Sequence, residues 1–155
     1  MKLMTFGYEG TKPSQFFSTL LGNKVETIVD LRELPLSRKP GFSKSALAKS
    51  AKRYNLNYVH IPALGCPREI RHAYRQDNNW SRYTRRFLSY LKTQEQTIDE
   101  LAKLIERERC CLLCFEADPN FCHRSYVAEN LTARNGAKLS VVHLRVPNPI
   151  QVAWD

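Results

Sequence analysis

The stretch CCLLCFEADPNFCHR (residues 110–124) joins a strand pattern to a helix pattern and contains a dense group of reactive side chains. Its first half (110–116) is a short apolar run, which is typical of a buried strand. Asp118–Pro119 follows, a pair that commonly begins a helix because Asp caps free amides and Pro fits the first turn. Apolar residues then recur at helical spacing from about 120 to 135, and Gly136 is a suitable C-terminal cap. This βα unit predicts an α/β fold.

The same alternation extends along the rest of the chain. Four other short apolar runs bounded by turn residues predict strands at 3–6, 25–32, 57–62 and 139–144. Helical patterns lie between them at 13–22, 43–54 and 96–109. Strands that alternate with helices form right-handed βαβ units. We therefore predict a single α/β domain over residues 1–155: a mostly parallel sheet of about five strands with helices on both faces, a Rossmann-like three-layer arrangement.

The composition is that of a globular protein, with 43% hydrophobic and 25% charged residues in a chain of 155. No stretch approaches the roughly 20 apolar residues of a membrane span, so no membrane association is expected. The start MKLMTFGYEG lacks the apolar core of a secretory signal. Five cysteines, an odd number without a signal, favour a cytoplasmic protein with free thiols.

The charge balance points to a polyanionic partner. The chain has 24 Lys and Arg residues against 15 Asp and Glu, a net charge of +9. Such a positive field attracts nucleic acid through counterion release, and DNA and RNA fit it equally well. The alternative is a cationic surface that only keeps the protein soluble.

The segment PREIRHAYRQDNNWSRYTRRF (67–87) concentrates this charge and interleaves arginines with aromatic residues. Arginines can bind a phosphate backbone while aromatic rings stack on bases. The spacing of Tyr83, Phe87 and Leu91 is also helical, so some of these rings can belong to the core instead. The expected nucleic-acid surface comprises Arg68, Arg71, Arg75, Trp80, Arg82, Arg85 and Arg86.

Parallel sheets bind ligands at the carboxyl ends of their strands, and polar residues cluster at those ends here. Residues i and i+2 of a strand share a face, so Asp30 should point with Arg32, and Cys114 with Glu116. One interpretation is that Arg32 binds an anion while Asp30 orients it or transfers a proton. The other is a structural ion pair between the two.

Two residues of the quoted stretch are candidates for acid–base chemistry. His123 has an ordinary pKa near neutrality, and Glu116 at a buried strand end can have a raised pKa. Arg124, near the expected helix start, could bind an anion together with Arg38 from the preceding loop region. Alternatively, Arg124 only pairs with Glu116 or Asp118.

The cysteines are candidates for metal binding and for thiol chemistry. Cys114, Cys122 and His123 are zinc ligands by type, but they lack the C-x-x-C knuckle of structural zinc sites. Adjacent helical residues also point about 100° apart, which would keep Cys122 and His123 from sharing an ion. No metal and no cofactor are therefore expected. A thiol role for Cys114 or Cys122 remains open beside a buried structural role.

Four stretches resemble, in order, the motifs of the domain-of-unknown-function family DUF488. They are TFGYEG (5–10), VDLRELPLSR (29–38), YVHIPALG (58–65) and CFEADPNFCHR (114–124). The resemblance implies a compact α/β fold. It also implies a set of signature positions: Asp30, Arg32, Pro35, Ser37, Arg38, Leu64, Gly65, Cys114, Glu116, Cys122, His123 and Arg124. Cys66 departs from the pattern, since glycine is more usual there.

The leading hypothesis is an enzyme that acts on a nucleic acid or nucleotide without a cofactor. The anion would be held by Arg32, Arg38 and Arg124, and protons would be handled by Glu116, His123 and Asp30. Hydrolysis of a phosphodiester or of an N-glycosidic bond fits these groups. One alternative is a non-catalytic module that recognises a phosphate terminus or a modified base. A second is a small-molecule enzyme with Cys114 or Cys122 as its nucleophile. The oligomeric state stays open.

Overall fold

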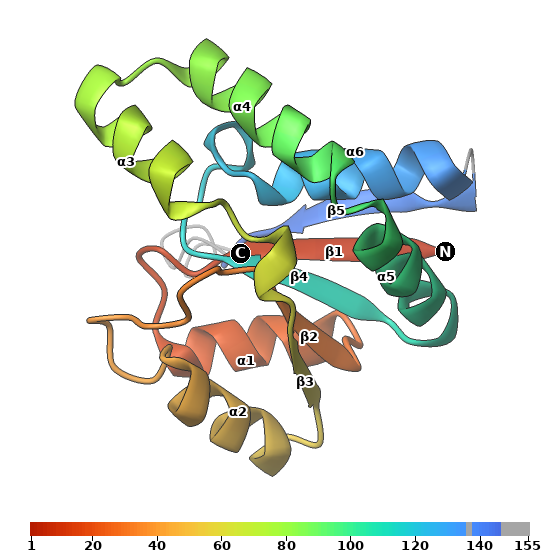
Figure 1. Cartoon of the computed structure of the whole chain (residues 1–155). Coiled ribbons are helices and arrows are strands. Elements are labelled where there is room, and N and C mark those ends of the chain that lie inside the picture. Colours follow the sequence, from red (N-terminus) through yellow and green to blue (C-terminus); the bar gives the residue numbers. More distant parts are fainter. Residues whose placement is uncertain (136–137, 147–155) are drawn as a thin grey trace, which may run out of the picture.

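A computed structural model describes residues 1–135 and 138–146 and contains one five-stranded sheet (Figure 1). All strand pairs are parallel, in the order β3-β2-β4-β1-β5. The strands are β1 (Lys2–Gly7), β2 (Thr27–Asp30), β3 (Asn57–His60), β4 (Cys110–Cys114) and β5 (Ser140–Leu144). The predicted α/β fold with a five-stranded parallel sheet is confirmed, although β2 is shorter than the apolar run that predicted it.

Helices cover both faces of the sheet and complete three layers (Figure 1). The helices are α1 (Pro13–Gly22), α2 (Lys44–Arg53), α3 (Arg68–Asp77), α4 (Trp80–Lys92), α5 (Glu95–Arg107) and α6 (Arg124–Asn135). Single 3-10 turns are formed by η1 (Pro62–Leu64) and η2 (Pro119–Phe121). Residues of α1 and α2 pack in one core cluster, and residues of α4, α5 and α6 pack in the other. No helix in the described ranges has the length and apolarity to cross a membrane.

The central position of β4 in the sheet explains why the sequence of this strand is apolar without interruption. Its side chains alternate between the two cores: Leu112 lies in the cluster with α4–α6, whereas Cys111 and Leu113 lie in the cluster with α1 and α2. A strand of a parallel sheet that is covered on both faces needs apolar residues at every position. The carboxyl end of β4 consequently lies deep between its neighbours β1 and β2.

The basic segment forms the two helices α3 and α4, with a break at Asn78. This residue adopts a left-handed conformation (φ 50°), and the Asn79 side chain then accepts a hydrogen bond from the Arg82 amide at the start of α4. Tyr83 and Phe87 are buried in the core. For these two rings the structure supports the core interpretation.

The last helix begins later than the sequence pattern suggests. Asp118 caps the 3-10 turn η2 by accepting from the Asn120 amide, and Cys122 then has extended backbone angles (φ −141°, ψ 136°). α6 begins only at Arg124. The expected start near residue 120 is therefore wrong, because the cap residue serves a short turn instead of the long helix. Gly136, the expected end cap, lies outside the described residues.

Candidate functional site

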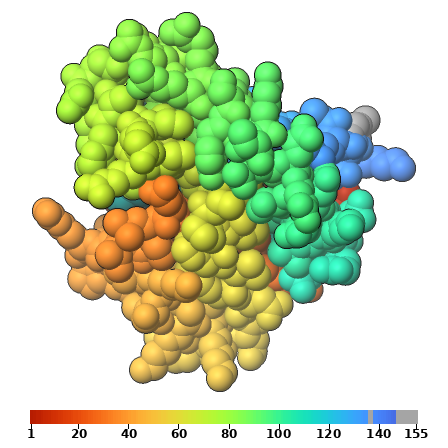
Figure 2. Space-filling model, viewed as in Figure 1, coloured from red at the N-terminus to blue at the C-terminus, as the bar shows by residue number. Residues whose placement is uncertain are grey.

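A cavity of about 610 Å³ lies at the carboxyl ends of the central strands. The segments that follow β1, β2 and β4 contribute Tyr8, Arg32 and Glu116 to its wall. The loop after β2 and the helices α3 and α4 form the remaining sides. In Figure 2 that loop (orange) lies beside α3 (yellow-green), and a darker teal patch is visible between them. This is the edge of the sheet at which the sequence places a site.

The wall on the α3–α4 side is aromatic. Trp80 stacks on Tyr83 with ring centroids 4.4 Å apart, and its edge meets Phe121 at 5.5 Å. Phe121 and Phe115 are 51% and 45% exposed, although both line the cavity. Sequence reasoning missed these two phenylalanines because it assigned the aromatic surface to the segment 67–87 alone. Their place next to Glu116 and Cys122 in the polar stretch was the available signal.

The cations predicted for nucleic acid divide into two groups. Arg71 and Arg75 of α3 line the cavity together with Arg38 and Lys39 of the loop after β2. Arg82, Arg85 and Arg86 line a separate hollow on α4, and Arg68 lines neither. The cations expected on one basic surface therefore line two separate hollows, since those of α3 lie on the cavity and those of α4 on the other hollow.

Glu116 lies just beyond the end of β4 and contributes its carboxyl group to the cavity wall. It is half-buried and lines the cavity, as expected for a residue just beyond β4. Burial, together with the nearby Cys122 charge, raises the pKa of Glu116 to about 7, although the positive charge of His123 opposes this shift. The predicted position of Glu116 at a buried strand end agrees with the structure.

Arg124 has a different place from the one expected. Its side chain is 0% exposed and does not line the cavity. The guanidinium donates to the carbonyls of Glu116 and Ala117 and to Oγ1 of Thr5. The expectation that Arg124 binds an anion is not supported, because all three of its nitrogens are bonded to the protein. The side chain instead fixes the backbone that carries Glu116.

Asp30 and Arg32 point together, as strand alternation predicts, but they bond to each other. Arg32 donates from Nε to Oδ1 (2.8 Å) and from Nη2 to Oδ2 (2.7 Å) of Asp30. Its Nη1 donates to the hydroxyl of Tyr8 and to the carbonyl of Phe42. Tyr58 donates its hydroxyl to Asp30, which is 0% exposed. The structure supports the structural ion pair, and the buried Asp30 has no access to a substrate. Arg32 lines the cavity, but four of the five N–H groups of its guanidinium are bonded within the protein.

Cys114, Cys122 and His123 converge directly beneath the cavity. One donor atom of each residue lies within 4.8 Å of the donors of the other two, and all three residues are buried. The argument that Cys122 and His123 diverge is wrong, since Cys122 precedes the helix in an extended conformation. Only His123 lines the cavity, at 7% exposure. The two thiols therefore have no direct access to a small-molecule substrate, which weighs against a cysteine nucleophile.

The three side chains of this cluster influence each other's protonation. Burial opposes the thiolate of Cys122, but hydrogen bonds from Cys114 and His123 and the charge of His123 lower its pKa well below the usual value. The pKa of Cys114 is raised, mainly by burial. Burial also disfavours a charged His123, yet the hydrogen bond to Cys122 and its charge raise the pKa of this imidazole.

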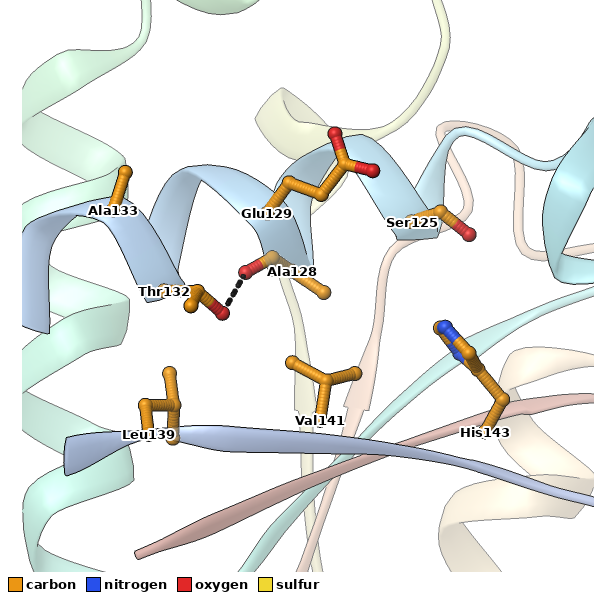
Figure 3. Close-up of a pocket in the computed structure, with 8 residues that line it drawn as sticks. All are labelled: Ser125, Ala128, Glu129, Thr132, Ala133, Leu139, Val141 and His143. Atoms are coloured by element: carbon orange, nitrogen blue, oxygen red, sulfur yellow. Dashed lines mark hydrogen bonds between the residues drawn. The ribbon is translucent and has the colours of Figure 1, made fainter. Parts of the chain in front are cut away.

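A second hollow of about 460 Å³ lies between α6 and β5 (Figure 3). Its ionisable residues are Glu129 and His143, and Thr132 donates its hydroxyl to the Ala128 carbonyl within α6. None of the predicted site residues lines it. The hollow is therefore separate from the candidate site.

The comparisons with known proteins identify a family. A model of the family described as "Domain of unknown function DUF488" matches residues 12–131. The chain belongs to the DUF488 family. The match includes three of the four resembling stretches, and TFGYEG (5–10) precedes it. No curated protein and no solved structure matches the chain. The DUF488 description states no activity, so a function must be argued from the site.

Proposed function

We propose that this DUF488 protein is an enzyme that acts on a nucleotide, either free or within a nucleic acid, bound in the cavity at the ends of β1, β2 and β4. One observation carries the proposal: a single cavity combines a carboxyl group, exposed aromatic rings and several cations. A nucleotide presents the matching chemistry, because it has a leaving group that needs a proton, a flat base and a phosphate.

The aromatic wall suits a base. Trp80, Phe115 and Phe121 line the cavity, and the two phenylalanines keep about half of their surface in solvent. Exposed rings of this kind are favourable once a flat partner covers them, and stacking a base on an aromatic ring contributes about 1–3 kcal/mol. The cavity volume of about 610 Å³ lies within the usual range for small-molecule sites.

The cationic rim suits a phosphate. Within the described part of the chain, Arg38, Lys39 and Arg75 form no salt bridge, and all three line the cavity. Arg71 pairs with Glu33 at 2.7 Å, and its buried Nε has no partner among the described residues. Cations without protein partners are available to bind an anion, as charge-assisted hydrogen bonds are the strong ones.

Glu116 is the group that we assign to proton transfer. Its side chain faces the cavity, and its backbone is held by Arg124. His123 is less suited to this role, because its Nε2 lies 3.2 Å from the Leu31 carbonyl and its ring is flanked by thiols. In the hydrolysis of a phosphodiester or N-glycosidic bond, the protonated Glu116 carboxyl would give its proton to the leaving oxygen or nitrogen as the bond to it breaks. The proton released by the attacking water would then restore the carboxyl.

The test separates binding from turnover in one variant. Purified protein is incubated with nucleotides and short DNA and RNA single strands, and products are followed by chromatography while binding is followed by isothermal titration calorimetry. Glu116→Gln should retain the affinity and lose turnover by about 100-fold or more, because general acid–base catalysis contributes about 10²–10⁴-fold. The matched control is Glu129→Gln, which removes a carboxylate from the separate hollow between α6 and β5.

Undiminished turnover in Glu116→Gln would remove the proposed catalytic role. Tight binding without turnover of any of these nucleic acids by the wild-type protein would instead support a binding module. Trp80→Ala tests the contribution of the aromatic wall to binding independently of proton transfer. This variant should weaken nucleotide binding by about 1–3 kcal/mol, because it removes a ring on which a base can stack.

A further inference from the structure

We propose that Cys114, Cys122 and His123 bind a zinc ion beneath the cavity. The inference goes beyond the proposed function and does not depend on it, because it rests on the donor atoms of these three residues. Cysteine thiolates and imidazole nitrogens are the donors that zinc prefers in proteins.

The donor atoms already lie close to the spacing that zinc requires. Zinc bonds of about 2.3 Å to sulfur and 2.0–2.1 Å to nitrogen place tetrahedral donors about 3.3–3.8 Å apart. One donor atom of each residue lies within 4.8 Å of the other two, and Cys114 Sγ is 3.4 Å from Nε2 and 3.9 Å from Nδ1 of His123. Movements below about 1 Å would bring them to bonding distances, which side-chain rotation can supply.

The hydrogen bond of His123 selects which ring nitrogen would bind the metal. Its Nε2 lies 3.2 Å from the carbonyl oxygen of Leu31. A carbonyl only accepts, so Nε2 carries a proton in this bond, and Nδ1 is the nitrogen left for the ion. A metal-binding histidine almost always donates its other ring N–H to a carboxylate, a carbonyl or water. The Leu31 carbonyl takes that role here.

The charges of the site also fit a divalent ion. Two thiolates would neutralise Zn²⁺, so the buried complex would carry no net charge, which avoids the high cost of an isolated buried ion. The buried Arg124 is committed to carbonyls and Thr5 rather than to either thiol. Oxygen-preferring cations such as Mg²⁺ and Ca²⁺ are excluded by the sulfur donors.

Three protein ligands rather than four are characteristic of zinc sites that keep an open position. Of the three ligands, His123 lines the cavity. The cavity is therefore the side from which water or a substrate atom would reach the ion.

Metal content of the whole chain tests the site directly. The protein is equilibrated with Zn²⁺ in the presence of a thiol reductant and passed through a desalting column. Its zinc content is then measured by inductively coupled plasma mass spectrometry. We expect about one zinc per chain. Replacement by Co²⁺ should give thiolate charge-transfer absorption and the d–d bands of a tetrahedral ion, which report the donor type without any activity assay.

Variants on one strand give a matched comparison. Cys114→Ser should lower zinc affinity by at least about 100-fold, since even outer-sphere changes cost 10–100-fold. Cys110→Ser is the control, because Cys110 is also buried, lies on the same strand and faces the same core. Circular dichroism checks folding. Should Cys114→Ser fail to fold, His123→Gln and the Co²⁺ spectrum of the wild-type protein answer the same question.

The proposal is overturned if the reduced wild-type protein retains less than about a tenth of a zinc per chain, or if Cys114→Ser binds as tightly as Cys110→Ser. Co²⁺ without thiolate absorption would also overturn it. These outcomes are distinct from those of the nucleotide test, which uses ligand affinity and turnover. A chain that binds zinc without turning over nucleotides would keep this site and lose the proposed function.

Discussion

Gly7 ends β1 where the backbone of that strand meets the backbone of Glu116. A Cβ atom built on Gly7 would lie 1.7 Å from the Glu116 carbonyl oxygen and 2.9 Å from Cα of Ala117. Backbone atoms cannot move aside as the end of a flexible side chain can. Arg124 donates hydrogen bonds to the carbonyls of Glu116 and Ala117 in the same segment. The position of Glu116 therefore depends on the absence of a side chain at Gly7 and on the hydrogen bonds from the buried guanidinium of Arg124.

Gly7→Ala should destabilise the protein by about 2 kcal/mol or more, because overpacking a close backbone contact typically costs 1–3 kcal/mol. Urea denaturation followed by circular dichroism measures the free energy of unfolding. Gly22→Ala is the control: it lies at the end of α1, its added Cβ would meet nothing within 4 Å, and its stability should stay within about 1 kcal/mol of wild type. Equal effects of the two substitutions would contradict the close contact.

The buried Asp30–Arg32 pair allows a second prediction at the same scale. Asp30→Asn should lower the free energy of unfolding by about 3–5 kcal/mol, because it leaves the guanidinium of Arg32 buried without its counter-charge. Tyr58→Phe removes one hydrogen bond to the same carboxylate and should cost only about 1 kcal/mol. Guanidinium denaturation separates the two values. Similar losses in both variants would show that the charge pair adds nothing beyond a hydrogen bond.

Among the elements, the strands were predictable because parallel strands covered on both faces need unbroken apolar runs. β4 is the clearest example, since each of its five residues is buried. α3 and α4 were recognisable only as a basic, aromatic segment, because the break at Asn78 depends on a single left-handed residue. The start of α6 was misplaced for a similar reason: Asp118 and Pro119 fit a 3-10 turn as well as a long helix.

That misplacement had a chemical consequence. With Cys122 assigned to a helix, the cluster of Cys122 and His123 was excluded; with Cys122 extended, both side chains reach Cys114. The partners of Arg124 were equally beyond sequence reasoning, because they are two backbone carbonyls and a threonine hydroxyl and not the carboxylates that charge matching suggests. Glu116 was predictable, since its place follows from strand length and parity alone.

The start of α4 offers a prediction at this scale. Asn79 accepts a hydrogen bond from the Arg82 amide at 3.0 Å, and Trp80 is the first residue of the helix. Asn79→Ala should reduce the free energy of unfolding by about 1 kcal/mol, whereas Asn79→Ser, which can still cap the helix, should retain most of it. Thermal unfolding followed by circular dichroism compares the two. A stable Asn79→Ala variant would mean that packing of α4 alone fixes the helix start.

For the whole molecule, the distribution of charge matters more than its sum. A net charge of +9 attracts any polyanion, but Arg38, Lys39, Arg71 and Arg75 line one hollow, whereas Arg82, Arg85 and Arg86 line another. Only one of these hollows also contains the exposed aromatic rings and Glu116. If the cavity binds a single strand, its cations should account for the salt dependence of binding, and the outer hollow should contribute little.

Two triple variants with the same change in net charge test this. Replacing Arg38, Lys39 and Arg75 by alanine should make the slope of log K against log salt shallower by about 2, because each phosphate contact of a single strand contributes about 0.7. Replacing Arg82, Arg85 and Arg86 removes equal charge from the outer hollow and should leave the slope nearly unchanged. Fluorescence anisotropy of a labelled single strand over a series of salt concentrations measures both. Equal losses would show that the positive field as a whole, and not the cavity, attracts the nucleic acid.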